Sequence, residues 1–222
     1  MGEGASKVVR SRLPRLRRPV KASLSGGRAV LRIYGDNRSG NCLKVKWTAE
    51  KLGLSYAWTD VDIMTGGSRT AEFLALNPAG QTPTVVLEDG RPLAQSNAIL
   101  LHLAEGSALI PADAYDRARM FEWLFWEQYS HEPYVAVARF QMLYLGKPKS
   151  DLDEKIVSRG EAALARLELG LAETPYLVGD ALSLADISLV AYTRVAHEGG
   201  FDLSAYPKVR AWIARVEADL GL

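Results

Sequence analysis

Apolar residues in the first half of the chain follow two spacings, one typical of strands and one typical of helices. Short apolar or alternating runs predict strands at residues 29–34, 56–63, 82–87 and 92–94. Between residues 41 and 53 the apolar positions are separated by 3, 4 and 3 residues, so they share one face of a helix that ends at Gly53. Further helices are predicted at 69–76 and 96–104.

These elements follow one another in the order β-α-β-α-β-β-α. A helix joins the first two strands, so they should be parallel. A turn at residues 88–91, which contains Asp89 and Gly90, predicts an antiparallel hairpin between the last two strands. This is the thioredoxin-like order.

The pattern changes after Pro111, where the strand signals end. Helical periods predict one long segment at residues 113–145, interrupted at Pro133. Shorter helices are predicted at 151–173, 183–197 and 207–220. We therefore expect two domains, a thioredoxin-like α/β domain at 29–106 and an all-α helical domain at 113–222.

Charge is distributed unevenly along the chain. Residues 1–30 contain eight Lys or Arg and one acid, Glu3, although the net charge of the whole chain is +1. The remaining 192 residues hold 19 bases and 25 acids, a net charge of −6. We predict that residues 1–28 form a basic, disordered arm, because they are rich in Arg and Ser and poor in acid. They lack the apolar region of a secretory signal peptide. Organelle targeting is compatible with this composition, and a nucleic-acid-binding tail is the less favoured alternative.

Several classes of protein do not fit the composition. Cys42 is the only cysteine, so no disulfide can form within the chain, which fits a reducing compartment. No run of 18 apolar residues is present, so we expect no membrane span. The three His and one Cys show no metal-ligand spacing, so we expect no metal.

Residues 39–42, Ser-Gly-Asn-Cys, lie where the first strand passes into the first helix. A helix N-terminus exposes unpaired N–H groups and a partial positive charge, so it stabilises an anion. The Ser39 hydroxyl or the Asn41 amide can add a hydrogen bond, although both residue types are also common helix caps. Cys42 shares the apolar face with Val45 and is expected in the core.

Two further segments can be interpreted either as part of a ligand-binding site or as ordinary local structure. A cis bond between Thr82 and Pro83 would turn the Thr82 backbone toward a ligand, whereas an ordinary trans proline at the start of a strand is the alternative. Gln95 and Ser96 precede a helix, where Ser96 can hold a carboxylate or simply cap the helix.

Together, these motifs resemble the cytosolic glutathione transferase family, in particular its bacterial theta-like and nu-like members. The resemblance covers about residues 31–222. In the second half it rests on residues 176–180 (Tyr-Leu-Val-Gly-Asp), Ser183, Asp186, residues 206–207 (Tyr-Pro), Trp212 and Arg215. The spacing of Ser183 and Asp186 also predicts a capping box, which is a structural feature.

The resemblance implies a binding site for glutathione on the thioredoxin-like half. The Thr82 backbone is expected to pair with the cysteinyl part of glutathione, beside a cis bond to Pro83. Gln95 and Ser96 are expected to hold the γ-glutamyl end. Gln81 lies where the family often places a polar residue near the glycyl carboxylate.

The resemblance also implies how the thiol is activated. Ser39 resembles the serine of theta-like members, and the segment from Ser39 to Asn41 resembles the pattern of nu-like members. A free thiol has a pKa of about 8.5, and a charge-assisted hydrogen bond of about 1.5–3 kcal/mol lowers it by roughly one to two units. We therefore predict Ser39 and Asn41 as the catalytic residues, with an exposed Cys42 as the alternative.

A second substrate is expected against the helical half, where the long segment carries several aromatic residues. We predict an electrophile site at Phe125, Tyr129 and Arg139, with core or dimer packing as the alternative for the aromatic residues. Arg139 in an apolar helix requires an anionic partner. His131 is interpreted as a surface or capping residue rather than a base.

The resemblance implies a cytoplasmic, homodimeric transferase with glutathione as co-substrate and a small hydrophobic electrophile, a peroxide or a disulfide as the second substrate. A glutathione-dependent disulfide reductase is the alternative that residues 39–41 favour. A non-catalytic binding module is a third hypothesis, against which the presence of Ser39, Pro83, Gln95 and Ser96 argues. Neither nucleic acid nor a membrane is expected as a partner.

Overall fold

The computed structural model describes residues 30–222, so the predicted basic arm at 1–28 lies outside the described residues. The elements of the first half are β1 (Leu31–Gly35), α1 (Gly40–Lys51), β2 (Tyr56–Asp60), a 3₁₀ turn (Gly67–Arg69), α2 (Ala71–Leu76), β3 (Thr84–Val86), β4 (Pro92–Ala94) and α3 (Ser96–Leu103). Their order is the predicted one. The strands form one sheet in the order β2-β1-β3-β4, with β1 and β2 parallel and the other pairs antiparallel.

Two predicted strands are longer than the observed ones. β2 ends at Asp60 because the Asp62 carboxylate accepts hydrogen bonds from the Met64 and Thr65 N–H groups and turns the chain. β3 begins at Thr84, so the cis peptide bond between Thr82 and Pro83 lies outside the sheet.

The second half is helical. Its elements are α4 (Ala114–Trp126), a π-helical segment (Glu127–Ala136), α5 (Val137–Arg139), a second π-helical segment (Phe140–Tyr144), a 3₁₀ turn (Lys149–Asp151), α6 (Glu154–Gly170), α7 (Leu184–Thr193), a second 3₁₀ turn (Ala196–Gly199) and α8 (Pro207–Leu220). The predicted interruption at Pro133 takes the form of the first π-helical segment, which fits a residue that has no N–H to donate.

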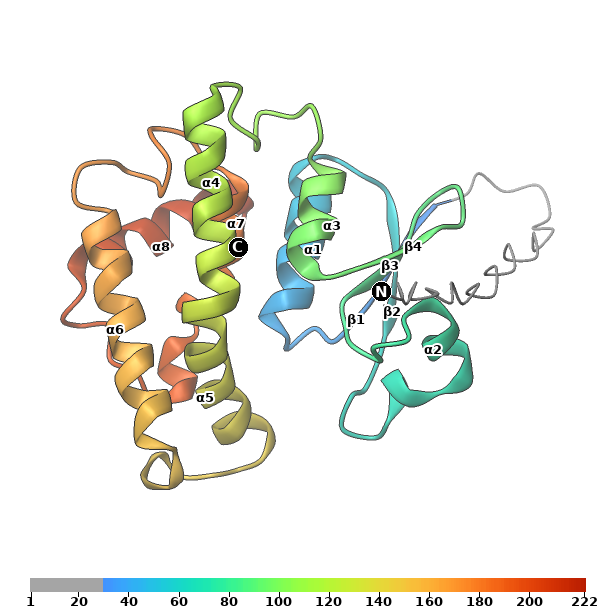
Figure 1. The fold of residues 1–222 in the computed structure, drawn as a ribbon, viewed down its shortest axis with the longest axis horizontal. Coiled ribbons are helices and arrows are strands. Elements are labelled where there is room, and N and C mark those ends of the chain that lie inside the picture. The colour runs from blue at the N-terminus through green and yellow to red at the C-terminus, as the bar shows by residue number, and fades with distance from the viewer. Residues whose placement is uncertain (1–29) are drawn as a thin grey trace, which may run out of the picture.

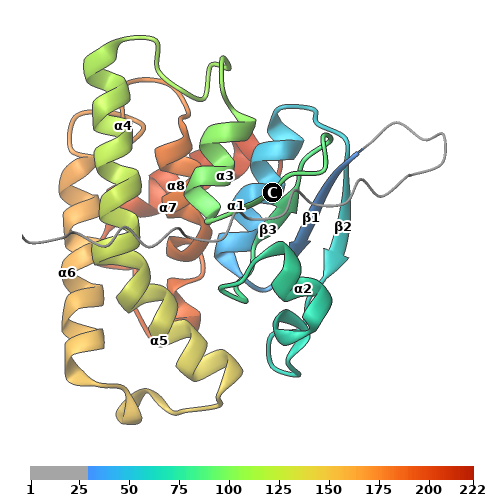
Figure 2. The same cartoon turned by 45° about the vertical axis from the view of Figure 1, so that its right-hand side comes forward.

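The two halves pack through α1 and α3, which lie between the sheet and the helical half (Figure 1). The apolar face of α1 is fully buried at Cys42, Val45 and Ala49, as predicted. α2 lies on the side of the sheet away from the helical half (Figures 1 and 2). One apolar core runs from β1 through α1 and α3 to α7 and α8, so the N-termini of α1 and α3 are held against the helical half.

The predicted capping box at the start of α7 is present. The buried Asp186 carboxylate accepts hydrogen bonds from the Ser183 N–H and hydroxyl at 2.9 and 2.8 Å, and also from the Leu177 N–H and the Trp212 indole. It thereby joins α7 to α8. No helix within residues 30–222 is both long and apolar enough to cross a membrane.

Candidate functional site

A cavity of about 510 Å³ lies where the thioredoxin-like half faces the helical half. The structure brings the predicted catalytic and glutathione-binding residues together on its wall, namely Ser39, Asn41, Gln81, Thr82, Pro83, Gln95 and Ser96. The N-termini of α1 and α3 both end at this wall, so their partial positive charges favour a bound anion.

Ser39 occupies the N-cap position of α1, but its side chain makes no capping hydrogen bond. Its hydroxyl instead lies 3.5 Å from the hydroxyl of Tyr192, a residue of α7 that also lines the cavity. The Ser39 hydroxyl is therefore not engaged by its own helix and is placed to contact a ligand.

The Asn41 amide is held in one orientation by two neighbours. Its oxygen accepts a hydrogen bond from the Ser96 hydroxyl at 3.2 Å, and its nitrogen donates to the Glu132 carboxylate at 3.3 Å. Because an amide nitrogen carries two hydrogens, one remains for a ligand. Burial, and the neighbouring Glu127, raise the pKa of Glu132.

The loop before β3 presents backbone groups to the cavity. The Thr82–Pro83 bond is cis, as the resemblance implied. Within residues 30–222 neither the Thr82 N–H nor its carbonyl has a hydrogen-bond partner. The buried Asn77 fixes this loop by donating to the Gln81 carbonyl at 2.8 Å and to the Thr84 hydroxyl at 3.1 Å.

Gln95 has a left-handed backbone, with φ 70° and ψ 110°, which is unusual for a residue other than glycine. Such conformations cost about 1–3 kcal/mol and are concentrated at functional sites. Ser96, the first residue of α3, is buried and directs its hydroxyl to Asn41 instead of capping the helix. The two residues therefore place one exposed amide and one buried hydroxyl on the cavity wall.

Arg69 is a cavity residue that the sequence analysis did not identify. Its guanidinium donates to the Ala79 carbonyl at 3.2 Å and lies against Gly80, where an added Cβ would be 2.4 Å from it. Within residues 30–222 it has no ion-pair partner. Arg69 thus offers a free positive charge beside Gln81.

The predicted electrophile residues are not brought together. Phe125 and Tyr129 are 74% and 82% exposed and do not line the cavity. Arg139 does line it, but its guanidinium binds Glu198 at 2.5 Å and the Arg38 carbonyl at 2.6 Å, which confirms the predicted anionic partner. The helical wall near Ser39 consists instead of Glu132, Ala136, Val137, Arg139, Phe140, Tyr144 and Tyr192.

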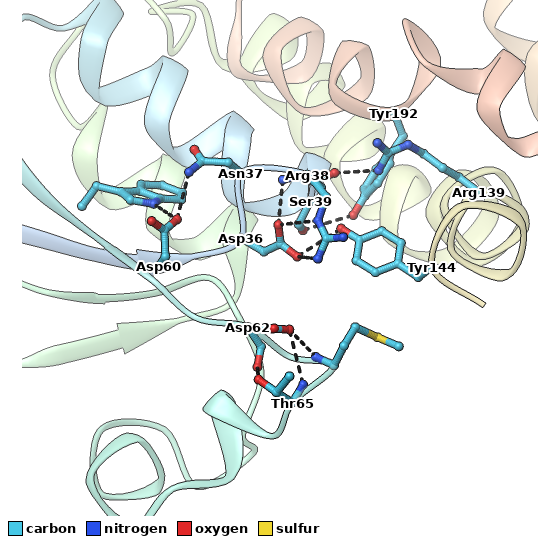
Figure 3. A network of polar contacts seen from close by, with 12 residues as sticks. Asp36, Asn37, Arg38, Ser39, Asp60, Asp62, Thr65, Arg139, Tyr144 and Tyr192 are labelled. Carbon is cyan, nitrogen blue, oxygen red and sulfur yellow. Dashed lines mark hydrogen bonds and ion pairs between the residues drawn. The ribbon is translucent and has the colours of Figure 1, made fainter. Parts of the chain in front are cut away.

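A polar network ties the loop that carries Ser39 to the helical half (Figure 3). The Asp36 carboxylate accepts hydrogen bonds from the Tyr144 hydroxyl at 3.2 Å and from Arg38. The Arg38 guanidinium lies 4.4 Å from the centre of the Tyr144 ring, and Arg139 holds the Arg38 carbonyl. The loop before α1 is thereby fixed at both its backbone and its side chains.

A second network, buried between the halves, was also missed. Lys44 of α1 and Glu127 are both 0% exposed and form an ion pair at 3.3 Å. Lys44 also donates to Ser188 of α7, and the Ser188 hydroxyl donates to Asn97 of α3. Sequence spacing gave no signal for this pair, because its partners are 83 residues apart.

The interpretation of His131 as a surface or capping residue is wrong. The side chain is fully buried, and its Nε2 lies 3.0 Å from the Thr193 hydroxyl. Burial lowers the pKa of His131 to about 4. Cys42 is buried as predicted, and burial raises the pKa of its thiol, which argues against a reactive cysteine. Within residues 30–222 no group of three or more His, Cys, Asp or Glu is arranged to hold a metal.

Comparison with known proteins agrees with this geometry. The family model for the glutathione S-transferase N-terminal domain matches residues 38–105, and that for the C-terminal domain matches residues 112–215. The chain is 33% identical to glutathione S-transferase 3 of Zea mays, over 86% of this chain and 90% of that protein. It is 28% identical to the disulfide-bond oxidoreductase YfcG of Escherichia coli, over 79% and 85%. A crystal structure of a glutathione S-transferase from Pseudomonas fluorescens is 52% identical, with a TM-score of 0.82, and covers 85% of this chain and 95% of that one.

Proposed function

Because the chain belongs to the glutathione S-transferase family, we propose that its cavity binds glutathione and that Ser39 activates the glutathione thiol. The protein is a glutathione transferase, with glutathione as its co-substrate. The observation that carries the proposed mechanism is the Ser39 hydroxyl, which is free of its helix at the N-terminus of α1 and faces the cavity.

The wall of the cavity suits each part of glutathione. The unpaired backbone groups of Thr82 match the amide groups of the cysteinyl part. Gln95 and Ser96, at the N-terminus of α3, match the charged γ-glutamyl end. Arg69 and Gln81 match the glycyl carboxylate, because within residues 30–222 the positive charge of Arg69 has no acidic partner.

Activation of the thiol follows from the position of α1. The thiolate is the reactive form, and a hydrogen bond from Ser39 together with the helix N-terminus stabilises it relative to the thiol. The Asn41 amide, fixed by Ser96 and Glu132, has one hydrogen left for the same sulfur. Ser39 and Asn41 are therefore the proposed catalytic residues.

The helical wall supports a small hydrophobic electrophile as second substrate. The rings of Phe140 and Tyr144 stack with centroids 5.0 Å apart, and Ala136 and Val137 line the same cavity. The guanidinium of Arg139 is occupied by Glu198, so it is not proposed as an anion-binding group. This wall replaces Phe125 and Tyr129 as the proposed electrophile site.

A glutathione-dependent disulfide reductase is the second candidate. Two observations favour it, the fixed Asn41 amide beside Ser39 and the 28% identity to the Escherichia coli disulfide-bond oxidoreductase. The reaction needs no protein cysteine, because two glutathione molecules can supply both thiols. The buried Cys42 is therefore not assigned a role in either candidate.

The proposed assembly is a homodimer. The exposed rings of Phe125 and Tyr129 lie one helical turn apart on the outer surface, and Phe125 stacks on Phe121 at 6.4 Å. Apolar surface of this kind favours contact with a second copy. The dimer, the cytoplasmic location and the domain limits 29–106 and 113–222 stay predictions.

The test is retention on immobilised glutathione, followed by titration of the thiolate absorbance of bound glutathione in the wild type and in Ser39→Ala. We expect retention in both, with a thiol pKa that is roughly one to two units higher in Ser39→Ala. A wild-type protein that is not retained would contradict the enzyme proposal and favour a binding module. Retention with an unchanged pKa would shift the catalytic role from Ser39 to Asn41.

A further inference from the structure

Tyr192 of α7 reaches across from the helical half to the N-terminus of α1. Its hydroxyl lies 3.5 Å from that of Ser39, and the side chain is only 7% exposed (Figure 3). This distance is long for two hydroxyls, which usually approach to roughly 2.5–3.0 Å. Catalytic hydrogen bonds are often long before the substrate binds and shorten in the complex.

Gly40 permits this approach. An added Cβ at Gly40 would lie 2.9 Å from three ring atoms of Tyr192, which is closer than real Cβ contacts allow. The ring therefore packs directly on the backbone between Ser39 and Asn41. The glycine between the two proposed catalytic residues has a physical function, because it makes room for a side chain from the other half.

We propose that Tyr192 is a positioning residue that donates its hydroxyl hydrogen to Ser39, so that the hydrogen of Ser39 points at the glutathione sulfur. The Ser39 hydroxyl has a single hydrogen. Once that hydrogen is donated to a thiolate, the Ser39 oxygen can only accept, and Tyr192 becomes its donor. This inference rests on the proposed role of Ser39.

The surroundings of Tyr192 keep its hydroxyl a donor. Burial raises the pKa of Tyr192, so the phenol stays protonated at neutral pH. Within residues 30–222 the Ser39 hydroxyl is the one group within hydrogen-bond distance of the Tyr192 hydroxyl, at 3.5 Å. The neighbouring titratable groups are Glu132 and Cys42, and burial raises the pKa of both. Because hydrogen bonds in a chain polarise one another, Tyr192 strengthens the bond that Ser39 makes.

The test is the pKa of the bound glutathione thiol in Tyr192→Phe, which loses the hydroxyl and keeps the ring. We expect this pKa to rise by about half a unit. At a pH below the pKa, the fraction of bound glutathione that is thiolate should therefore decrease about threefold. The kcat below that pKa should decrease by the same factor, with the KM for glutathione unchanged. Tyr206→Phe is the matched control, because its hydroxyl binds Glu161 away from the cavity.

If Tyr192 acts through Ser39, which we call the relay, the effect of Tyr192→Phe on the thiol pKa requires the Ser39 hydroxyl. A purely structural role of Tyr192 predicts no such requirement. In the Ser39→Ala background, Tyr192→Phe should cause no further change in the thiol pKa. Conversely, incorporation of 3,5-difluorotyrosine at position 192 keeps the hydroxyl and makes it a stronger donor, so it should lower the thiol pKa. The second measurement also decides the matter if Tyr192→Phe does not fold.

The relay is overturned if Tyr192→Phe has a thiol pKa within about 0.1 unit of the wild type. It is also overturned if Tyr192→Phe raises this pKa equally with and without Ser39. A wild-type protein that does not lower the thiol pKa at all would overturn the role of Ser39 and the relay together. A lowered wild-type pKa that is insensitive to Tyr192 would overturn the relay alone.

Discussion

Removal of the buried lysine at position 44 should destabilise the protein strongly, and the size of the effect follows from its surroundings. Lys44 is the cation of a fully buried ion pair with Glu127. In Lys44→Met the remaining hydrogen bonds to the Glu127 carboxylate come from the neutral amides of Asn97 and Gln128. One carboxylate oxygen of Glu127 already has no partner within the described residues. Loss of one member of a buried pair costs about 3–5 kcal/mol, because it leaves an uncompensated charge.

For a domain pair of this size, that loss corresponds to a decrease in Tm of roughly 6–20 °C. The assay is thermal and urea-induced unfolding at a fixed protein concentration. Lys46→Met is the matched control, because Lys46 belongs to the same helix but is only partly buried, and its effect should be below about 1 kcal/mol.

The double variant Lys44→Met/Glu127→Gln distinguishes a buried charge from lost packing. It removes both charges and should recover at least half of the stability that Lys44→Met loses. The reasoning is refuted if the double variant is as unstable as the single one, or if Lys44→Met unfolds at the temperature of the wild type.

Two further predictions concern pH and glutathione binding. The folded-state pKa of His131 is lowered to about 4, so its contribution is present above pH 6.5 and is lost as the pH falls toward 4. The free energy of unfolding of the wild type should decrease by up to about 3 kcal/mol across this window, whereas that of His131→Phe should not. Urea unfolding at several pH values measures this difference. Equal losses in both proteins would contradict the prediction. Arg69→Ala should raise the KM for glutathione about fivefold without changing kcat, since an exposed charge contributes about 1 kcal/mol of uniform binding. Arg91→Ala, on the β3–β4 hairpin, should leave both constants unchanged, and an unaltered KM in Arg69→Ala would remove Arg69 from the site.

The sequence predicted most of the thioredoxin-like half because local patterns determine it. The apolar face of α1 and the hairpin between β3 and β4 follow from spacing and turn residues alone. The cis bond at Pro83 does not, and only the resemblance to a family supplied it. Lys44 shows the limit of local patterns, because its polar partners Glu127 and Ser188 come from distant segments of the chain.

The separation of Phe125 and Tyr129 from the cavity that Arg139 lines has a geometric cause. At 100° per residue, Phe125 and Arg139 would lie within about 40° of each other on one helix face. The ten-residue π-helical segment between them has wider turns, of about 4.4 residues, and so shifts the phase by about half a turn. Arg139 consequently lines the cavity whereas Phe125 faces away from it. A sequence analysis that assumes 3.6 residues per turn throughout does not detect this shift in helical phase.

α1 contacts β1, α3 and α7, and its first residues carry the groups proposed to act on sulfur. A ligand that moves α7 relative to the sheet therefore changes the free energy of the thiolate without touching it. Coupling of this kind is reciprocal. If bound glutathione increases the affinity of the protein for an electrophile by some factor, the bound electrophile increases the affinity for glutathione by the same factor. The interface between the halves thus links the two binding equilibria, and selection for a new second substrate acts on glutathione affinity as well.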